Sequence, residues 1–498
     1  MARIKIDFDR KLGRVDRRIF GNFIEHLGRC IYGGVFDEGS PLSDERGFRR
    51  DVLEAARNLR IPVLRWPGGN FVSGYHWTDG IGPRDHRPRR MELAWGAEES
   101  NRFGTDEFLA YCAAMATEPY ICVNMGSGTF DEAQAWVEYC NGTGNTYWAN
   151  VRRANGHPKP YGVKLWGLGN EMYGAWQIGA LDAEAYVKKA RQFASVMKLT
   201  DPSIELVSCG QWGFGEWDRI VVDGLARSVR YHSIHIYTGS PDFDRNVFMP
   251  HQAERALRVC SAYIERARYE QRIEHPIGIA YDEWNVWFRE RGPAERAKGL
   301  EEHYDLSDAL AVAAFLNIFI RNCRWVEIAN LAQMVNVIAP IFTNRQGLFL
   351  QTIYHPLRLY AEHVQPIALD AFVDAPPRSA PAPSGAPSGE RQWDVSDLGP
   401  FSLLDVSATC DADSGEVCIA VVNRSRTEGM PTTISLDHAA ATAVRCYVVN
   451  GPDVDSQNSF ERPDCVGVRE STVPARSDSI DYTFEPHSVT VLRYGSQK

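Results

Sequence analysis

Two short stretches of the chain place a carboxylic acid directly after an apolar run. In GVKLWGLGNEM the run leads into Asn170 and Glu171, and in IGIAYDEWNVWF a second run leads into Asp282 and Glu283. Short apolar runs bounded by glycines are typical of buried strands, so both glutamates are expected at strand ends. Paired carboxyl groups suit glycoside hydrolysis, in which one acid protonates the departing oxygen and the other attacks the anomeric carbon or activates water.

Other apolar runs also end in polar side chains. These are Glu25 and His26, Arg65, Asn70, Asn124, Gln211, His235 and Tyr237, and Asn330 and Gln333. The amides of Asn70, Asn170 and Gln333 are suited to hold sugar hydroxyls. Arg65 is suited to keep one carboxylate ionised by charge pairing. One strand-terminal glutamate is as readily explained by a salt bridge, but three such glutamates favour a site.

Some neighbouring residues have a plainer structural explanation. If the strand continues without interruption, Asp282 points away from Glu283, and we expect it to be structural. His232 and His235 have the spacing HxxH, which on a strand divides them between two faces, so we expect no metal site there. The basic stretch PRDHRPRRM, residues 83–91, is expected to be a solvated loop that could also shape the site entrance.

The elements that must position these residues alternate along the chain. About eight strand-like runs are separated by helix-like stretches, the clearest being residues 106–116 and 183–200. This alternation predicts a parallel sheet, and the number of units predicts an α/β fold of the (β/α)8 TIM barrel type, with its active site at the carboxyl ends of the strands. An open doubly wound sheet is the alternative. It would be favoured by a phosphate-binding loop, but in GLGNEM the third glycine of GxGxxG would fall at Met172.

The residue pattern of the sequence changes after about residue 360. Period-2 and β-branched runs separated by turns predict a C-terminal antiparallel β-sandwich, jelly-roll-like in type. The opening strand RIKIDFDR is expected to join it. We therefore divide the chain into residues 1–16, which join the sandwich, a catalytic barrel over 17–362 and the sandwich over 363–498. The Pro/Ser/Gly-rich stretch 375–390 is expected to be a loop within the sandwich.

Composition narrows the choice of partner and compartment. The chain has 498 residues and a formal net charge of -10, without a basic stripe, so nucleic acid is not an expected partner. The longest apolar run, residues 309–320, is too short to span a bilayer and is expected to be a core helix. Eleven cysteines without CxxC spacing, and a start without an apolar leader segment, favour a reducing cytoplasm.

Five motifs in order resemble glycoside hydrolase family 51, the α-L-arabinofuranosidases. They are FIEHLGRCIYGGVF, LRWPGGNFVSGYHWTDGIGP, WGLGNEM followed after Tyr173 by GAWQIG, YDEWNVW, and ANLAQMVNVIAPIFT. The resemblance covers essentially the whole chain. It implies a retaining, exo-acting enzyme that releases terminal arabinofuranosyl groups from arabinan, arabinoxylan or derived oligosaccharides, without metal or organic cofactor. It also implies a homo-oligomer, often a hexamer in this family.

The resemblance assigns roles that residue spacing alone leaves open. Glu171 would be the general acid/base and Glu283 the nucleophile, so that at rest Glu171 is protonated and Glu283 ionised. The sugar or the nucleophile would be contacted by Glu25, Asn70, Asn170, Tyr237 and Gln333, with Trp287 walling the site and Arg65 and His235 in support.

Two rival functions remain open at this stage. The first is an enzyme of the same fold with a different substrate specificity, such as an endoglucanase or a β-xylosidase. The second is a carbohydrate-binding protein without catalysis, which the presence of both Glu171 and Glu283 disfavours.

Overall fold

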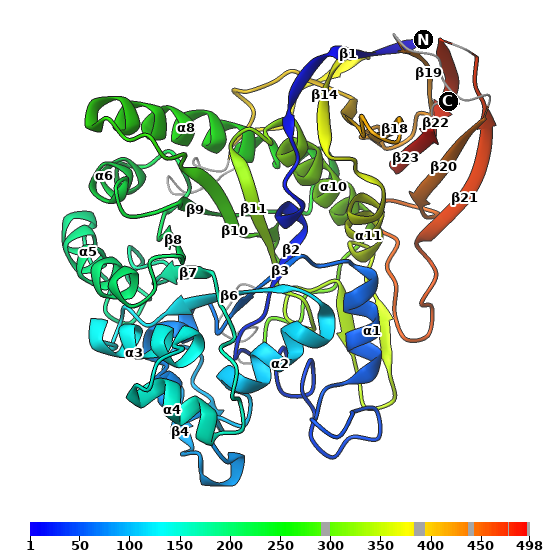
Figure 1. Cartoon of the computed structure of the whole chain (residues 1–498). Helices are drawn as coiled ribbons and strands as arrows, with labels where there is room; N and C mark the ends of the chain where they lie inside the picture. Colours follow the sequence, from blue (N-terminus) through cyan, green and yellow to red (C-terminus); the bar gives the residue numbers. More distant parts are fainter. Residues whose placement is uncertain (290–298, 383–393, 437–442, 477, 496–498) are drawn as a thin grey trace.

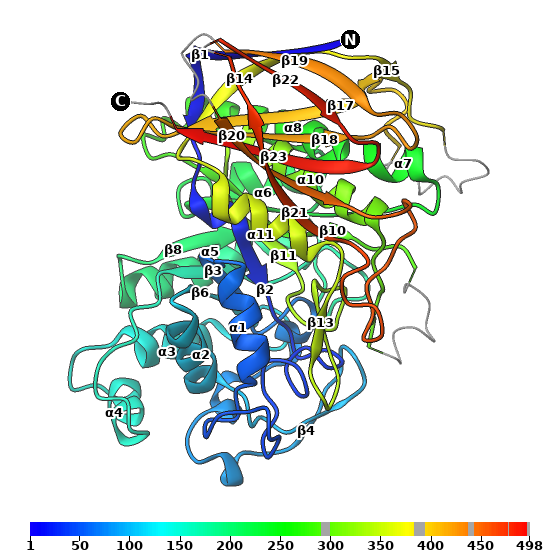
Figure 2. The same cartoon turned by 90° about the vertical axis from the view of Figure 1, so that its right-hand side faces the viewer.

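The structure is a computed structural model that describes residues 1–289, 299–382, 394–436, 443–476 and 478–495. A closed barrel of eight parallel strands forms the larger part, and a nine-stranded sheet lies beside it (Figures 1 and 2). The expected TIM barrel with a C-terminal, mostly antiparallel β domain is confirmed. The open doubly wound sheet is excluded because the barrel closes.

The barrel strands follow one another around the ring in chain order. They are β2 (Gly21–Phe23), β3 (Val63–Trp66), β6 (Glu118–Val123), β7 (Leu165–Leu168), β8 (Glu205–Ser208), β9 (Tyr231–Thr238), β10 (Gly278–Val286) and β11 (Val326–Ala332). Strand β11 pairs with β2 and closes the ring. Glu171 therefore follows the fourth strand and Glu283 belongs to the seventh, as expected from the sequence, although Glu283 lies inside β10 and not at its end.

Helices surround the barrel (Figure 1). They are α1 (Arg50–Asn58), α2 (Thr105–Met115), α3 (Phe130–Asn141), α4 (Tyr147–Ala154), α5 (Ala183–Thr200), α6 (Glu216–Leu225), α7 (Phe243–Phe248), α8 (His251–Gln271), α10 (Leu306–Arg321) and α11 (Tyr354–His363). Side-chain caps mark several starts; for example, Asp182 accepts a hydrogen bond from the backbone of Ala185 at the start of α5.

Helix α10 shows how the barrel and the sheet share one core. Its apolar residues are buried on every side because the helix packs against β10 of the barrel and against the sheet. Its one interior amide, Asn317, is satisfied by hydrogen bonds with Tyr360, Asp405 and Ser407. The expected core helix is confirmed. Among the described residues, no helix is both long enough and apolar enough to cross a bilayer.

Alternation along the strands fills the barrel interior. The side chains of Val63, Tyr120, Leu165, Val207, Tyr231, Ala280 and Ile328 form one buried cluster drawn from seven strands. Residues two positions further along, such as Arg65 on β3 and Ser233 on β9, lie one layer nearer the carboxyl end. The same alternation leads from Tyr231 through Ser233 to His235 and Tyr237, and so carries polar groups to the mouth of the barrel.

The second domain is one continuous sheet in the order β21-β20-β23-β18-β17-β14-β1-β19-β22. Its strands are β1 (Ala2–Arg14), β14 (Ile367–Asp374), β17 (Leu404–Cys410), β18 (Glu416–Asn423), β19 (Met430–Leu436), β20 (Ala443–Asn450), β21 (Gly467–Pro474), β22 (Ser479–Phe484) and β23 (Ser488–Gly495). The sheet curls over its own core: Sγ of Cys446 on β20 and Oη of Tyr482 on β22 are 3.3 Å apart, although these strands stand far apart in the pairing order.

Strand β1 ties the start of the chain to this sheet. It pairs antiparallel with β14 and parallel with β19. On this basis we propose the division expected from the sequence, at residues 16 and 362. Within the Pro/Ser/Gly-rich stretch, β15 (Pro377–Arg378) pairs with β16 (Phe401–Ser402), whereas residues 383–390 lie outside the described residues.

Candidate active site

A cavity of about 410 Å³ lies at the carboxyl ends of the barrel strands. Seven of the residues singled out from the sequence line it: Glu25, Asn70, Glu171, Tyr237, Glu283, Trp287 and Gln333. The other three, Arg65, Asn170 and His235, are buried and hydrogen-bonded to the two central glutamates or to each other. The structure therefore brings all ten predicted residues together.

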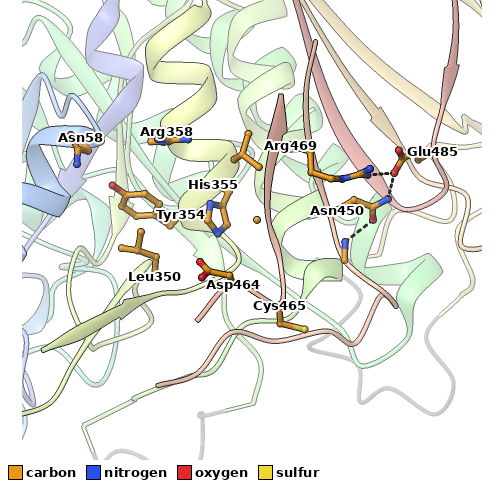
Figure 3. A pocket seen from close by; sticks show the side chains of 13 residues that line it. Asn58, Leu350, Tyr354, His355, Arg358, Asn450, Asp464, Cys465, Arg469 and Glu485 are labelled. Atoms are coloured by element: carbon orange, nitrogen blue, oxygen red, sulfur yellow. Dashed lines mark hydrogen bonds and ion pairs between the residues drawn. The ribbon is translucent and has the colours of Figure 1, made fainter. Parts of the chain in front are cut away.

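A larger cavity, of about 730 Å³, lies away from the barrel mouth, between α11 and the ends of β20 and β21 (Figure 3). Arg358, Asp464 and the ion pair of Arg469 with Glu485 give it mixed charge. None of the ten residues lines it, and its two acids, Asp464 and Glu485, come from the sheet domain rather than from strand ends of the barrel. The smaller cavity is therefore the candidate site.

Glu283 is held by donors on both of its carboxylate oxygens. Nη1 of Arg65 donates to Oε1 at 2.7 Å, and Oη of Tyr237 donates to Oε2 at 2.8 Å. The side chain is only 7% exposed. Such an arrangement holds an ionised oxygen in a fixed direction at the edge of the cavity, which is the requirement for a nucleophile.

The expectation that Asp282 points away from Glu283 is wrong. The pairing of β10 with β9 shifts register between Ala280 and Glu283, an irregularity of the β-bulge kind that turns both acids inward. Nε of Arg65 lies 3.6 Å from Asp282, in addition to its contact with Glu283. Asp282 also accepts hydrogen bonds from Tyr120 at 2.7 Å and from Ser233, deep in the barrel.

Glu171 stands just beyond the end of β7 with a backbone φ of 43°. This left-handed conformation is uncommon for a residue other than glycine and is characteristic of functional sites. Oη of Tyr173 lies 3.1 Å from Oε1, and Nε1 of Trp176 donates to Oε2 at 3.2 Å. Nδ1 of His235 lies 3.1 Å from the same Oε1.

The charge environment of Glu171 differs from the expected resting state. Burial raises the pKa of this carboxyl, but the hydrogen bond and positive charge of His235, together with the hydrogen bonds of Trp176 and Tyr173, lower the pKa overall. Burial likewise opposes charge on His235, yet Glu283, Asp282 and Glu171 raise its pKa to about 10. The expected proton is therefore favoured on the histidine side of this hydrogen bond and not on Glu171.

Arg65 links the two halves of the site. While Nη1 contacts Glu283, Nη2 donates to Oδ1 of Asn170 at 2.7 Å. This fixes the orientation of the Asn170 amide, whose Nδ2 is buried without a hydrogen-bond partner among the described residues. A buried donor without a partner, beside the acid, is available for a substrate hydroxyl.

Glu25 forms the opposite wall. Its Oε1 accepts hydrogen bonds from the backbone of Phe71 at 3.0 Å and from Nε1 of Trp95 at 3.1 Å, and its Oε2 accepts from Gln333 at 2.9 Å. Burial is the main cause that raises its pKa to about 8, with a further contribution from the nearby charge of Glu283. The neutral form of Glu25 is therefore favoured more strongly than in an ordinary exposed glutamate.

Aromatic side chains complete the walls, and the sequence reasoning missed two of them. Trp287 packs edge-to-face on Tyr237, with ring centroids 5.3 Å apart, as expected for a wall of the site. Trp95 and Trp176 also line the cavity but were not singled out. Trp176 lies within the GAWQIG motif, where its closeness to Glu171 is a usable signal. Trp95 follows the basic stretch and carries no such signal.

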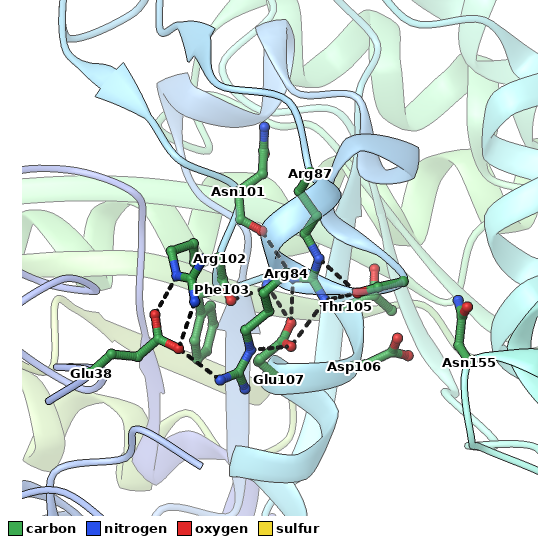
Figure 4. Close-up of polar contacts among 12 residues, drawn as sticks. Glu38, Arg84, Arg87, Asn101, Arg102, Phe103, Thr105, Asp106, Glu107 and Asn155 are labelled. Atoms are coloured by element: carbon green, nitrogen blue, oxygen red, sulfur yellow. Dashed lines mark hydrogen bonds and ion pairs between the residues drawn. The ribbon is translucent and has the colours of Figure 1, made fainter. Parts of the chain in front are cut away.

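The basic stretch itself is not a simple solvated loop. Arg87 is buried and bonds Glu107 at 2.8 Å, while Arg84 bridges Glu107 and Glu38, each at 3.0 Å (Figure 4). These ion pairs fasten the segment that leads through β4 (Arg90–Met91) to Trp95 and back through β5 (Glu98–Glu99). The segment thus braces a wall of the cavity.

One group among the described residues is close enough to bind a metal ion. Ligand atoms of Glu171, His235 and Glu283 all lie within 4.8 Å of one another. Each of these atoms already has a polar partner within the site, which is the arrangement of an acid–base cluster. In contrast, His232 lies on the outer face of β9 against Asp218, at 3.1 Å, so the HxxH pair is divided as expected.

Comparisons with known proteins converge on one family. Residues 55–255 match the model described as α-L-arabinofuranosidase 1 domain, and residues 282–488 match α-L-arabinofuranosidase C-terminal domain. A protein of Aspergillus niger, "Probable alpha-L-arabinofuranosidase C", is 46% identical over 99% of this chain and 97% of its own.

A bacterial relative and a solved structure agree with the fungal protein. The Bacillus subtilis protein named "Intracellular exo-alpha-(1->5)-L-arabinofuranosidase 1" is 34% identical over 100% of this chain and 99% of its own. The structure of the thermostable GH51 α-L-arabinofuranosidase from Thermotoga petrophila RKU-1 superposes with a TM-score of 0.90 at 39% identity, covering 99% of this chain and 100% of that one.

Proposed function

The chain belongs to the α-L-arabinofuranosidases of glycoside hydrolase family 51, and from that premise we propose a retaining, exo-acting mechanism for its α-L-arabinofuranosidase activity. The substrates are terminal non-reducing α-L-arabinofuranosyl groups of arabinan, arabinoxylan or derived oligosaccharides. The name of the Bacillus subtilis relative supports exo action on (1→5) linkages. A cavity of about 410 Å³ supports it too, since that is the size of a small-molecule pocket.

The observation that carries the proposal is the closeness of the two glutamates. An oxygen of Glu171 and an oxygen of Glu283 lie within 4.8 Å of each other. Retaining glycosidases hold their carboxyl groups roughly 5–5.5 Å apart, whereas inverting enzymes leave roughly 6.5–9.5 Å for a water molecule. The separation therefore supports a double displacement.

The donors around each carboxyl support one assignment of roles. Glu283 receives hydrogen bonds from Arg65 and Tyr237 on its two oxygens and is the nucleophile. Its oxygen attacks the anomeric carbon while Glu171 delivers a proton to the departing oxygen. In the second step Glu171 takes a proton from water, the water oxygen attacks the same carbon, and Glu283 leaves as a carboxylate.

Contacts to the sugar follow from groups that line the cavity or are adjacent in sequence to a residue that lines it. The free Nδ2 of Asn170 is placed to donate to the hydroxyl beside the reacting carbon, a hydrogen bond that strengthens as the oxocarbenium-like transition state forms. Glu25, Asn70 and Gln333 bind the other ring hydroxyls, and Trp287 packs on the ring. These roles are proposals that the lining of the cavity supports.

We propose the cytoplasm as the location and a homo-oligomer as the working form. The location is supported by the relative that is named intracellular. The oligomer, a hexamer by family resemblance, is supported by that resemblance alone. Neither metal nor organic cofactor enters the proposed steps.

The test is hydrolysis of 4-nitrophenyl α-L-arabinofuranoside with the product anomer followed by NMR from the first turnover. Release of α-L-arabinofuranose is expected, and first formation of the β anomer would overturn retention. A panel of aryl glucosides and xylosides, with an endo-cleavage assay on soluble glucan, tests the rival specificities. A rate on any of these above that on the arabinofuranoside would favour an endoglucanase or a β-xylosidase. Absence of hydrolysis on every substrate would favour a non-catalytic binding protein.

A further inference from the structure

His235 is surrounded by carboxylates on both sides of its ring. Its side chain, 4% exposed, projects from β9 into the barrel. Nδ1 lies 3.1 Å from Oε1 of Glu171 and 3.6 Å from Oε2 of Glu283. Nε2 lies 3.3 Å from Oδ1 of Asp282. Both ring nitrogens therefore face an oxygen that accepts hydrogen bonds.

This geometry restricts where protons can be. A neutral imidazole carries a proton on only one of its two ring nitrogens. The lone pair of the other nitrogen would then face a carboxylate oxygen unless that carboxyl group were itself protonated. Asp282 is fully engaged as an acceptor, with Tyr120 and Ser233 donating to it and Arg65 beside it. The lone pair would then have to be at Nδ1, and the missing proton on Glu171. The Glu171–His235 hydrogen bond thus contains one proton, which is bound either to the carboxyl group of Glu171 or to Nδ1 of His235.

The surrounding charges favour the histidine. The single positive charge of Arg65 lies against Asp282 and Glu283 and offsets only one of their two negative charges, and among the described residues Arg65 makes no hydrogen bond or ion pair with Glu171. The other groups that contact Glu171 in the described part of the chain are the neutral hydroxyl of Tyr173 and the indole of Trp176. The remaining titratable groups around the pair are Tyr237 and Cys209, both shifted by burial toward the neutral form, and Glu25 on the far wall.

We propose that the resting enzyme stores the acid's proton on Nδ1 of His235 and that Glu171 receives it there, across 3.1 Å, as the glycosidic bond breaks. The inference rests on the proposed function and deepens it. His235 acts through Glu171 and does not contact the substrate, so it is a positioning residue for the proton. Storage of the proton on His235 explains why the buried acid/base catalyst lies beside a cationic side chain.

The steps balance without any further reactant. In the first step, Glu283 bonds to the anomeric carbon and the glycosidic bond breaks. Nδ1 of His235 gives its proton to Glu171 while Glu171 passes a proton to the departing oxygen, so that Glu171 remains a carboxylate and His235 becomes neutral. In the second step, water bonds to the same carbon, the ester bond to Glu283 breaks, and the water proton passes through Glu171 back to His235. The cycle ends with the imidazolium and two carboxylates restored.

The deciding experiment is a nitrogen NMR titration of the protein labelled in histidine, with the His235 signals assigned by their loss in His235→Gln. In the wild type both ring nitrogens of His235 should carry a proton at neutral pH. One protonated and one bare nitrogen at that pH would overturn the proposal, whatever the protein hydrolyses. The measurement uses the wild-type chain, so it holds even if a variant folds poorly; His235→Asn is the second assignment variant.

Two variants at the same oxygen separate proton storage from simple contact. Glu171→Gln removes the negative charge that faces Nδ1, so His235 should lose its proton at a lower pH than in the wild type. Tyr173→Phe removes a different hydrogen bond to the same Oε1 at the same 3.1 Å and removes no charge. The His235 titration should move far less in this control than in Glu171→Gln. Equal shifts in both variants would contradict the proposal.

Kinetics then test whether the stored proton is used. With a substrate whose departing group needs protonation, the basic limb of kcat/KM should move to lower pH in His235→Gln, because a carboxyl becomes the last group to hold the proton. The limb should move far less in Tyr173→Phe. A limb that does not move in His235→Gln would overturn the relay. If the wild type hydrolyses no arabinofuranoside, the proposed function fails, while the NMR result still decides the proton's position.

Discussion

Oη of Tyr237 donates a hydrogen bond to Oε2 of Glu283 at 2.8 Å, and the same ring packs edge-to-face on Trp287. One tyrosine thus joins the carboxylate proposed as the nucleophile to the aromatic wall proposed to bind the sugar. The two functions are separable because the first needs only the hydroxyl and the second only the ring.

Tyr237→Phe should therefore lower kcat and leave KM nearly unchanged, since it removes a hydrogen bond that directs the nucleophile but keeps the ring contact. A loss of about 10–100-fold in kcat is expected, by comparison with about 10²–10³ for a donor lost from an oxyanion hole. The matched variant is Trp287→Ala, which should chiefly raise KM. Steady-state kinetics on an aryl arabinofuranoside measure both. The assignment is contradicted if Tyr237→Phe raises KM and spares kcat.

Asn170 allows a second test that distinguishes substrate binding from catalysis. Because its Nδ2 is unpaired in the free site, Asn170→Ala removes a contact that gains most of its strength in the transition state. We expect kcat to fall on the order of 10²–10³-fold with a modest change in KM. A substrate with hydrogen in place of the hydroxyl beside the reacting carbon is the control, since the variant and the wild type should then differ far less.

A near-normal kcat in Asn170→Ala would contradict this role. A large loss that persists with the deoxy substrate would instead indicate that Asn170 acts by fixing Arg65, to which its Oδ1 is bonded at 2.7 Å.

Strand periodicity explains which parts of the site could be predicted from the sequence. Glu171 and Glu283 were placed correctly because apolar runs ending in acids identify strand ends, and in a closed barrel all strand ends meet. The division of His232 from His235 followed from the two-residue period alone. Which glutamate plays which role could not be derived this way, because it depends on donors from distant strands, such as Arg65.

The errors have the same physical origin. Asp282 was expected to face away because nothing in YDEWNVW marks the register shift that turns it inward beside Glu283. Arg87 was expected in solvent because its partner, Glu107, is 20 positions further along. Trp95 was missed because a loop carries no period from which its direction could be read. Local patterns predict strands well, whereas bulges and loops depend on tertiary contacts.

Glu25 should make the free enzyme less stable at alkaline pH. Burial raises its pKa to about 8, above the ordinary value of a glutamate, so the folded state binds a proton that the unfolded state has lost. The free energy of unfolding should therefore fall as the pH rises from the pKa of Glu25 in the unfolded state, near ~4.3, to its pKa in the folded state. Glu25→Gln cannot ionise and should raise the melting temperature relative to the wild type more above pH 8 than in mild acid. A difference independent of pH would contradict the inference.

The junction between the domains should weaken in acid. Arg321 on α10 bonds Asp405 on β17 at 2.7 Å and Glu254 on α8 at 2.9 Å. Burial opposes charge on Asp405, but Arg321 and Arg424 lower its pKa overall. A lowered carboxyl pKa stabilises the fold above the unfolded value, near ~3.9, and this stabilisation is lost as pH falls through the folded value.

Asp405→Asn should accordingly lower the free energy of unfolding by about 3 kcal/mol at neutral pH, the lower end for breaking a buried pair. The loss should shrink in strong acid, where the wild-type carboxyl is also neutral. Asp370→Asn is the control, because its pair with Arg10 is largely exposed and should change stability by less than about 1 kcal/mol. Urea denaturation at several pH values measures both; equal losses in the two variants would contradict the argument.

The roles of the two glutamates make opposite stereochemical predictions. In Glu171→Ala, a substrate with a departing group that needs no protonation still reacts with Glu283, but no base then activates water. Added azide needs no base and should attack from the face that the departing group left, giving α-L-arabinofuranosyl azide. In Glu283→Ala, azide can only replace the missing carboxylate on the opposite face, so the product should be the β-azide. NMR of the two products measures the anomers directly. Exchanged anomers would mean that the roles are reversed, and absence of rescue in both variants would remove the support for a double displacement.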